Sequence, residues 1–295
     1  MGLAFKPSMI YCFDTSAVNA LCDDQEQSKV LSRLFASHRA HISCVNIAEV
    51  VSTSDAPRRH MLLSLLKRMS NDTNPLMMPN KLIRRATKAF AKGKSSLTIT
   101  ISREDASFWW LMDDPTSASD VEQREALQWK KSLEQPFIDA HREARPAFQS
   151  LFSDAEPRPR SLAQLLRSFR QQDSAIYDFL KRFYKKETGR YLSRDTMWRM
   201  FEILPQWPLY LAGWGHEMFA RAIRTSKYGI RGKPGTLDLW CAIYLPICDR
   251  FVTNDDGQYR ALRLLNVLNK RFFETPTKTH VLRYDRFKEE LFAGV

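Results

Sequence analysis

The sequence lacks the features that mark membrane and secreted proteins. It has no apolar run near the roughly 20 residues that a transmembrane helix needs, and the apolar stretch at its start is too short for a secretory signal. We therefore expect no membrane insertion and a cytoplasmic location, or a nuclear one in a eukaryote. Ten Gly against fourteen Pro leave little room for flexible linkers.

Several motifs of common enzyme classes are also missing. The five Cys form no C-x-x-C pair and have no companion His at zinc-ligand spacing, so we interpret them as small buried apolar residues. The six His form no metal-ligand pattern. There is no Gly-rich phosphate loop, no G-x-S-x-G motif and no repeat of solenoid period. These absences leave nucleotide hydrolysis by a phosphate loop and serine esterase chemistry without support.

The composition is that of a globular protein with a strong excess of positive charge. Of 295 residues, 44% are hydrophobic and 26% charged, and the net charge is +12. Counted by segment, the net charge is −2 over 1–57, +9 over 58–94, −5 over 95–159, +9 over 160–233 and +1 over 234–295. A basic chain concentrates polyanions around itself, so the middle of the chain predicts a nucleic-acid partner.

Both ends of the chain alternate strand and helix patterns. MIYCFD (9–14) and HISCVN (41–46) predict two strands, each followed by a helical pattern. After residue 230, LDLWCAIYLPICD (237–249) predicts an apolar helix, followed by the strands RFVTND (250–255) and KTHVLRY (278–284) and by helices. This order predicts an α/β domain with a parallel sheet flanked by helices.

The middle of the chain has a different texture. Residues 58–229 show helical patterns broken by Pro and by Ser/Asp clusters, and they hold six of the seven Trp. We predict two parts: a discontinuous α/β domain formed by 1–57 and 230–295, and an inserted, mainly helical, basic subdomain formed by 58–229.

Four acidic residues occupy similar positions in the predicted α/β domain. Asp14 ends the first strand, Asp255 ends the strand RFVTN, Asp238 begins a helix, and Glu49 lies in the first turn of the helix that we expect to start at Asn46. The carboxyl ends of parallel strands and the starts of the following helices meet at one edge of a sheet. We therefore expect the four carboxylates to face one another.

Such a cluster of like charges is costly unless a cation offsets it. Mg²⁺ or Mn²⁺ prefers oxygen ligands and can activate a water for phosphodiester hydrolysis, so the sequence predicts a metal-dependent nuclease. Each acid also has a purely structural alternative. Asp14 and Asp238 suit helix N-caps, Glu49 with Asn46 fits a capping box, and Asp255 with Asp256 fits a turn.

The four motifs together resemble those of the PIN-domain nuclease family. They are CFDTSAV (12–18), ISCVNIAEV (42–50), DLWCA (238–242) and FVTND (251–255). The resemblance implies a PIN-like parallel sheet flanked by helices and an endoribonuclease activity with Mg²⁺ or Mn²⁺. It also implies that Asp14, Glu49, Asp238 and Asp255 are both catalytic residues and metal ligands, and that Thr253 and Ser16 support them. Asp256 adjoins Asp255 and is a second candidate for its role, but the T-x-D spacing selects Asp255. The departure from the family is the large insertion between Glu49 and Asp238.

Basic and aromatic residues interleave in two stretches of the predicted insertion, KLIRRATKAFAKGK (81–94) and KRFYKKETGRYLSRD (181–195). This composition suits phosphate contacts and base stacking, although a charge run can also be a solvated face. The predicted nucleic-acid contacts are Arg84, Arg85, Lys185, Lys186, Arg231 and Lys233.

The partner that we expect is RNA, with DNA open because both are bound mainly through phosphate. A homodimer or a regulatory protein partner is also left open. Two alternatives to an endoribonuclease remain: a non-catalytic RNA-binding or scaffold protein on a PIN-like fold, and a structure-specific DNA nuclease.

Overall fold

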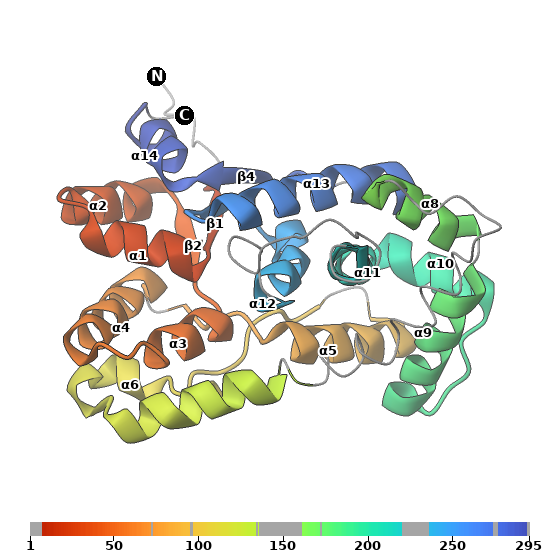
Figure 1. Cartoon of the computed structure of the whole chain (residues 1–295), viewed down its shortest axis with the longest axis horizontal. Helices are drawn as coiled ribbons and strands as arrows, with labels where there is room; N and C mark the ends of the chain where they lie inside the picture. The colour runs from red at the N-terminus through yellow and green to blue at the C-terminus, as the bar shows by residue number, and fades with distance from the viewer. Residues whose placement is uncertain are drawn as a thin grey trace.

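A four-stranded parallel sheet lies at one side of a largely helical protein (Figure 1). The computed structural model describes residues 8–71, 73–94, 97–133, 135, 161–171, 173–219, 236–273 and 277–293. The strand order is β2-β1-β3-β4, with every pair parallel. The strands are β1 (Ile10–Phe13), β2 (Arg39–His41), β3 (Arg250–Thr253) and β4 (His280–Arg283). The predicted α/β class with a parallel sheet is confirmed.

The chain changes direction across the sheet between β1 and β3. From β1 it passes to β2 on one side, and it later returns to the other side of β1 to form β3 and then β4. In open parallel sheets, ligands bind outside the carboxyl ends of the strands at such a switch point. The register pairs Phe13 with Val252, so the residues that follow β1 and β3 lie side by side there.

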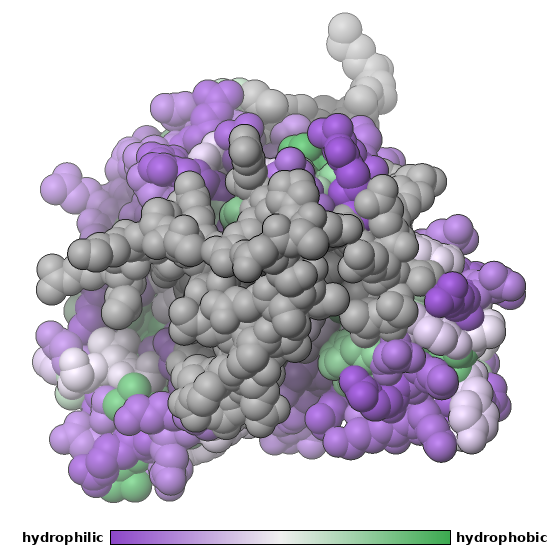
Figure 2. Space-filling model, turned by 45° about the vertical axis from the view of Figure 1, so that its right-hand side comes forward, coloured by the Kyte–Doolittle hydropathy of each residue, from purple (hydrophilic) through white to green (hydrophobic). Residues whose placement is uncertain are grey.

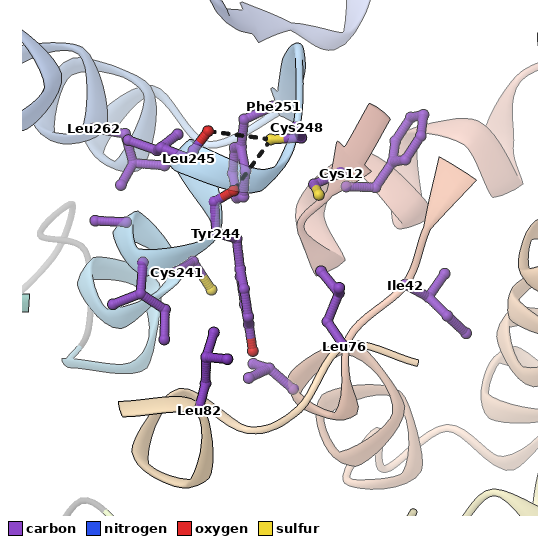
Figure 3. Packing of buried hydrophobic residues seen from close by; sticks show 14 of the residues in the cluster. Cys12, Ile42, Leu76, Leu82, Cys241, Tyr244, Leu245, Cys248, Phe251 and Leu262 are labelled. Atoms are coloured by element: carbon purple, nitrogen blue, oxygen red, sulfur yellow. Dashed lines mark hydrogen bonds between the residues drawn. The ribbon is translucent and has the colours of Figure 1, made fainter. Parts of the chain in front are cut away.

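Helices cover both faces of the sheet. On one face, α14 packs Phe287 edge-on against Tyr11 and Phe13 of β1, with ring centroids 5.4 and 5.2 Å apart. Alternate residues of a strand point to opposite faces, so Cys12 lies on the other face, near η3 and α13 (Figure 3). The helices of the two terminal parts of the chain are α1 (Thr15–Asp23), α2 (Gln27–Ser37), α3 (Cys44–Val51), α12 (Thr236–Trp240), η3 (Cys241–Ile247), α13 (Asp256–Phe273) and α14 (Tyr284–Ala293).

The range predicted as an insertion is mainly helical where it is described. Residues 120–133 form a further helix, which follows η1. The other elements of this range are α4 (Ala56–Ser70), α5 (Pro79–Ala91), α6 (Trp110–Asp113), η1 (Pro115–Ser117), α8 (Leu162–Gln171), α9 (Asp173–Thr188), α10 (Arg194–Ile203) and α11 (Gln206–Met218).

The range 58–229 and the sheet share one hydrophobic core. Figure 3 shows Leu76 and Leu82 beside Cys241 and Tyr244 of η3. The Tyr244 hydroxyl is buried and donates a hydrogen bond to the Met77 carbonyl, at 2.6 Å. The proposed boundary between the two parts therefore runs through continuous apolar packing.

Two predicted elements were wrong. HISCVN is not a strand, because β2 ends at His41 and α3 begins at Cys44. Ser43 caps this helix in a capping box with Asn46, so Glu49 lies in the middle of α3 rather than in its first turn. The apolar helix predicted over 237–249 is a short α-helix followed by the 3₁₀ turn η3. Pro246 lies near the end of η3, where its missing N–H and its ring oppose an α-helix that continues through this segment.

Helix length and surface hydropathy bear on whether the chain crosses a membrane. Of the helices that the structure describes, none is long and apolar enough to cross a bilayer. On the face in Figure 2, hydrophilic residues cover most of the described surface, and the hydrophobic ones form small separate patches.

Arg59 of α4 is almost completely buried and holds three segments together. Its guanidinium donates to the Thr53 carbonyl at 2.6 Å and to the Ala118 carbonyl at 3.0 Å, and it lies 3.3 Å from the Asp120 carboxylate. These contacts join the end of α3 to the start of helix 120–133. Gln123 adds a bond from its side-chain amide to the Ser52 carbonyl, at 3.2 Å.

We expect Arg59→Met to lower the free energy of unfolding by about 2–4 kcal/mol, because it leaves buried carbonyls without donors. The neighbouring Arg58 pairs with Asp23 at the surface, so Arg58→Met should cost less than about 1 kcal/mol. Urea unfolding of both variants measures the difference. Equal losses would show that the buried guanidinium does not anchor helix 120–133.

Candidate metal centre

The Asp14 carboxylate lies at the switch point, between β1 and β3. It is 6% exposed and caps α1 by accepting a hydrogen bond from the Ala17 N–H, at 2.7 Å. The Ser16 hydroxyl donates to it at 2.8 and 2.9 Å, and the Thr253 hydroxyl of β3 lies 2.7 Å from Oδ2. Ser16 and Thr253, two of the residues predicted to support the site, therefore both contact Asp14.

Thr253 connects Asp14 to the start of α13. Its hydroxyl accepts a hydrogen bond from the Asp255 N–H at 3.0 Å and lies 2.8 Å from the side-chain carbonyl of Gln258. A hydroxyl has one proton, so it can donate to Asp14 or to Gln258 but not to both. If Asp14 is protonated, it can donate to Thr253, which then donates to Gln258.

The electrostatics favour this protonated form. Burial raises the pKa of Asp14 to about 7, against the lowering effect of the hydrogen bonds from Ala17, Thr253 and Ser16. The Asp238 carboxylate raises it further. Near neutral pH, Asp14 is thus poised between its neutral and charged forms.

Asp238 lies in the first turn of α12, three residues before Cys241. It is therefore not the N-cap that the structural alternative suggested, because the helix begins at Thr236. Helix α11 packs closely against this segment: a Cβ on Gly213 would lie 3.2 Å from the Leu239 carbonyl oxygen. The Gln258 side-chain amide also donates to the Asp238 backbone carbonyl, at 3.2 Å.

Three of the predicted acids act electrostatically on the buried Cys241. After desolvation, the groups that raise the pKa of its thiol are Asp238, Glu49 and Asp14, in decreasing order. Figure 3 shows this thiol among buried apolar residues, near Leu82 and Tyr244. Three acids far apart in the sequence are thus within electrostatic range of one thiol, and Asp238 also acts on Asp14.

Glu49 reaches this edge from the middle of α3, and both of its oxygens have partners. The Thr15 hydroxyl donates to Oε2 at 2.5 Å, and the Lys130 ammonium lies 3.2 Å from Oε1. Asn46 donates in turn to the Thr15 hydroxyl, at 3.2 Å. Lys130 comes from helix 120–133 of the predicted insertion.

Asp255 and Asp256 differ from the other three acids because both are exposed. Asp255 accepts a hydrogen bond from the Gln258 N–H at 2.6 Å and so caps α13, whereas its structural alternative was a turn with Asp256. Asp256 forms ion pairs with Arg283 and Arg260. The described geometry therefore groups Asp14, Glu49 and Asp238, with Asp255 joined to them through Thr253.

The donor chemistry of this group fits a hard divalent cation. Carboxylate and hydroxyl oxygens are the ligands that Mg²⁺ and Mn²⁺ prefer. In the described part of the chain, no three His, Cys, Asp or Glu side chains come close enough together to hold a metal ion. Mg²⁺ often uses one or two carboxylates and keeps several waters, so two of these acids are sufficient ligands for such a site.

The predicted nucleic-acid contacts divide between two packed helices and an undescribed segment. On α5, Arg84 pairs with Glu187 of α9, and the guanidinium of Arg85 contacts the Met77 sulfur at 3.8 Å. Lys185 and Lys186 on α9 are exposed. Arg231 and Lys233 lie outside the described residues.

Gln258 and Lys130 were not among the residues predicted for the site. Both have the same sequence signal. Gln258 lies three and four residues before the buried Ala261 and Leu262, and Lys130 lies four residues after the buried Ala126. Each is thus a polar residue on the apolar stripe of a helix. Such a position needs a buried polar partner. Here the partners belong to the residues around Asp14, Glu49 and Asp238 at the carboxyl edge of the sheet.

The raised pKa of Asp14 predicts how stability depends on pH. An unfolded Asp has a pKa of roughly 3.9, so between about pH 4 and 7 the folded state keeps a proton that the unfolded state loses. The resulting stabilisation is complete below pH 4 and is lost as the pH rises through 7. Asp14→Asn stays neutral, so its advantage over the natural chain should grow to about 2–4 kcal/mol by pH 8.

Urea unfolding in chelator at pH 5, 6, 7 and 8 tests this expectation. Asp256→Asn is the control, because its carboxylate is exposed and should give a difference that does not grow with pH. A constant difference for Asp14→Asn would mean that the Asp14 carboxylate is charged throughout this range.

The acidic edge is thus defined by its own residues: a buried Asp14, a Glu49 bound by Thr15 and Lys130, and an Asp238 close enough to raise the pKa of Asp14. Comparisons with protein-family models, with curated proteins and with solved structures found no match.

Proposed function

We propose that this chain is a divalent-metal-dependent nuclease that hydrolyses phosphodiester bonds of RNA. The observation that carries the proposal is that Asp14 lies buried at the switch point of a parallel sheet and that Asp14, Asp238 and Glu49 all act electrostatically on the buried Cys241. Burial and the Asp238 carboxylate both oppose the negative charge of Asp14, and a bound divalent cation would remove that conflict.

Asp14 and Asp238 are the residues that would hold Mg²⁺ or Mn²⁺, with Glu49 and Asp255 completing the set. When bound, such an ion lowers the pKa of a water and offsets charge on the phosphodiester. The chain's own groups orient the ligands. The hydroxyls of Ser16 and Thr253 and the Ala17 N–H fix the Asp14 carboxylate, and Gln258 connects Thr253 to the backbone of Asp238.

The surface formed by α5 and α9 supports RNA as the substrate. The basic side chains of the two helices lie together because the helices pack against each other, as Figure 1 shows. Lys185 lies over the ring of Tyr191, 5.0 Å from its centroid, and this Tyr is 75% exposed. An exposed aromatic ring beside exposed Lys side chains suits base stacking together with phosphate contact.

Glu187 limits which cations of this surface can bind phosphate. Its nearly buried carboxylate pairs with both Arg84 and Lys88 of α5. Lys185 and Lys186 project from α9 into solvent, so we propose them as the main phosphate contacts.

Asp14→Asn and Asp238→Asn should each abolish Mn²⁺-dependent cleavage while changing RNA affinity by no more than a few-fold, since affinity depends on the basic surface. Asp256→Asn is the matched control and should retain cleavage, because Asp256 pairs with Arg residues outside the acidic group. Labelled single-stranded RNA, duplex RNA and single-stranded DNA are digested in parallel, with Mn²⁺ and with chelator.

Each outcome separates the alternatives. Cleavage of DNA alone would identify a DNA nuclease on the same metal chemistry. RNA binding without cleavage of any substrate would identify a non-catalytic RNA-binding protein. Undiminished cleavage by Asp14→Asn would remove Asp14 from the active site.

The charge reversal Lys185→Glu with Lys186→Glu should weaken RNA binding and flatten its salt dependence. If each Lys neutralises one phosphate, the slope of log affinity against log salt should decrease by about 1.4, or about 0.7 for each contact. The control Lys270→Glu with Arg271→Glu makes the same change of charge on α13. Fluorescence anisotropy of a short RNA at several salt concentrations measures both, and identical slopes for the two variants would exclude α9 as the contact surface.

A further inference from the structure

The ion pair between Glu49 and Lys130 is a feature of the acidic edge that the proposed function leaves unexplained. The two side chains belong to α3 and helix 120–133, and they are 17% and 32% exposed. Partly buried pairs are screened less by salt than surface pairs. The Lys130 ammonium is therefore a positive charge that acts on the acidic edge with little screening by salt.

The N-terminal end of helix 120–133 is anchored to the residues that follow α3. Arg59 binds the Ala118 carbonyl and the Asp120 carboxylate, and Gln123 binds the Ser52 carbonyl. Further along, Trp129 packs edge-on against Phe108, with centroids 6.3 Å apart. Lys130 thus approaches Glu49 from a helix with fixed anchors rather than from a loose surface chain.

The occupancy of Glu49 has a direct consequence for metal binding. Lys130 occupies Oε1 and Thr15 occupies Oε2, so both carboxylate oxygens already have partners. Each oxygen keeps a second lone pair, so a divalent cation that takes Glu49 as a ligand need not displace either donor, but it meets the charge of the Lys130 ammonium 3.2 Å from Oε1. The Lys130 contact is the one that carries competing positive charge.

We propose that Lys130 is the resident cation of the acidic edge and that it competes with the divalent ion for Glu49. In the metal-free protein the ammonium offsets the charge of Glu49 beside Asp14 and Asp238. When the ion binds, the ammonium leaves Glu49. The insertion thereby sets the metal concentration at which the site fills. This inference rests on the proposed function, since it assumes that the acidic edge binds a divalent ion.

Mn²⁺ binding followed by electron paramagnetic resonance of the free ion tests the competition without any measurement of cleavage. Lys130→Met keeps the long side chain and removes its charge, and it should tighten Mn²⁺ binding by about tenfold. Lys130→Arg keeps the charge and should stay within about twofold of the natural chain. Lys131→Met is the matched control, because it removes an exposed charge from the next position and should also have little effect.

Thermal unfolding in chelator provides the second measurement. Lys130→Met should lower the melting temperature, because it leaves a partly buried Glu49 without its counterion. Adding Glu49→Gln to this variant should restore the temperature, since the pair then carries no charge, and this double-mutant cycle isolates the ion pair.

The outcomes distinguish this inference from the proposed function. Equal Mn²⁺ affinity for Lys130→Met and the natural chain would overturn the competition while leaving a metal site. Equal tightening by Lys131→Met would overturn it as well, because the effect would then come from net charge. Absence of Mn²⁺ binding in every variant would overturn the proposed function and this inference with it.

Discussion

The buried Asp14 carboxylate is the interaction on which the proposed site depends. It follows β1, accepts the Ala17 N–H at the start of α1 and contacts the Thr253 hydroxyl of β3, so one side chain joins two strands and a helix. Its burial opposes ionisation, whereas its three hydrogen-bond donors favour it. The hydrogen bonds that position the carboxylate thus stabilise its charged form, whereas its burial stabilises its neutral form. A cation near it would settle this conflict in favour of charge.

Helix capping and metal binding are not exclusive roles for these acids. A capping carboxylate lies at the positive end of a helix, at the edge of the sheet where ligands bind. Asp14 and Asp255 both cap helices, so capping alone cannot separate a structural acid from a functional one. Burial separates them: Asp14 lies beside other acids in the protein interior, and Asp255 is open to solvent.

The sequence predicted the parts of the fold that depend on local patterns. Short apolar runs that end in polar residues marked β1, β3 and β4, and their order implied a parallel sheet. The prediction failed at β2 because Ser43 and Asn46 both suit an N-cap, and the reciprocal bonds between them start the helix earlier. It also missed Lys130, which contacts Glu49 across 81 positions of the chain. The only sequence signal of such a contact is a charged residue on the apolar face of a helix. This signal does not identify the residue that it contacts.

The range 58–229 contacts the acidic edge at two points, so this range and the sheet build the same site. Glu49 is bound by Lys130, and the segment that carries Asp238 packs against α11, where a side chain at Gly213 would press on the Leu239 carbonyl. Asp14, in contrast, is held entirely by residues close to β1 and β3. A change in helix 120–133 or in α11 would therefore move Glu49 or Asp238 relative to a fixed Asp14. Since interiors are close-packed and transmit strain, the shared core gives the range 58–229 a physical route to these two carboxylates. This range thereby sets the positions of Glu49 and Asp238 relative to Asp14.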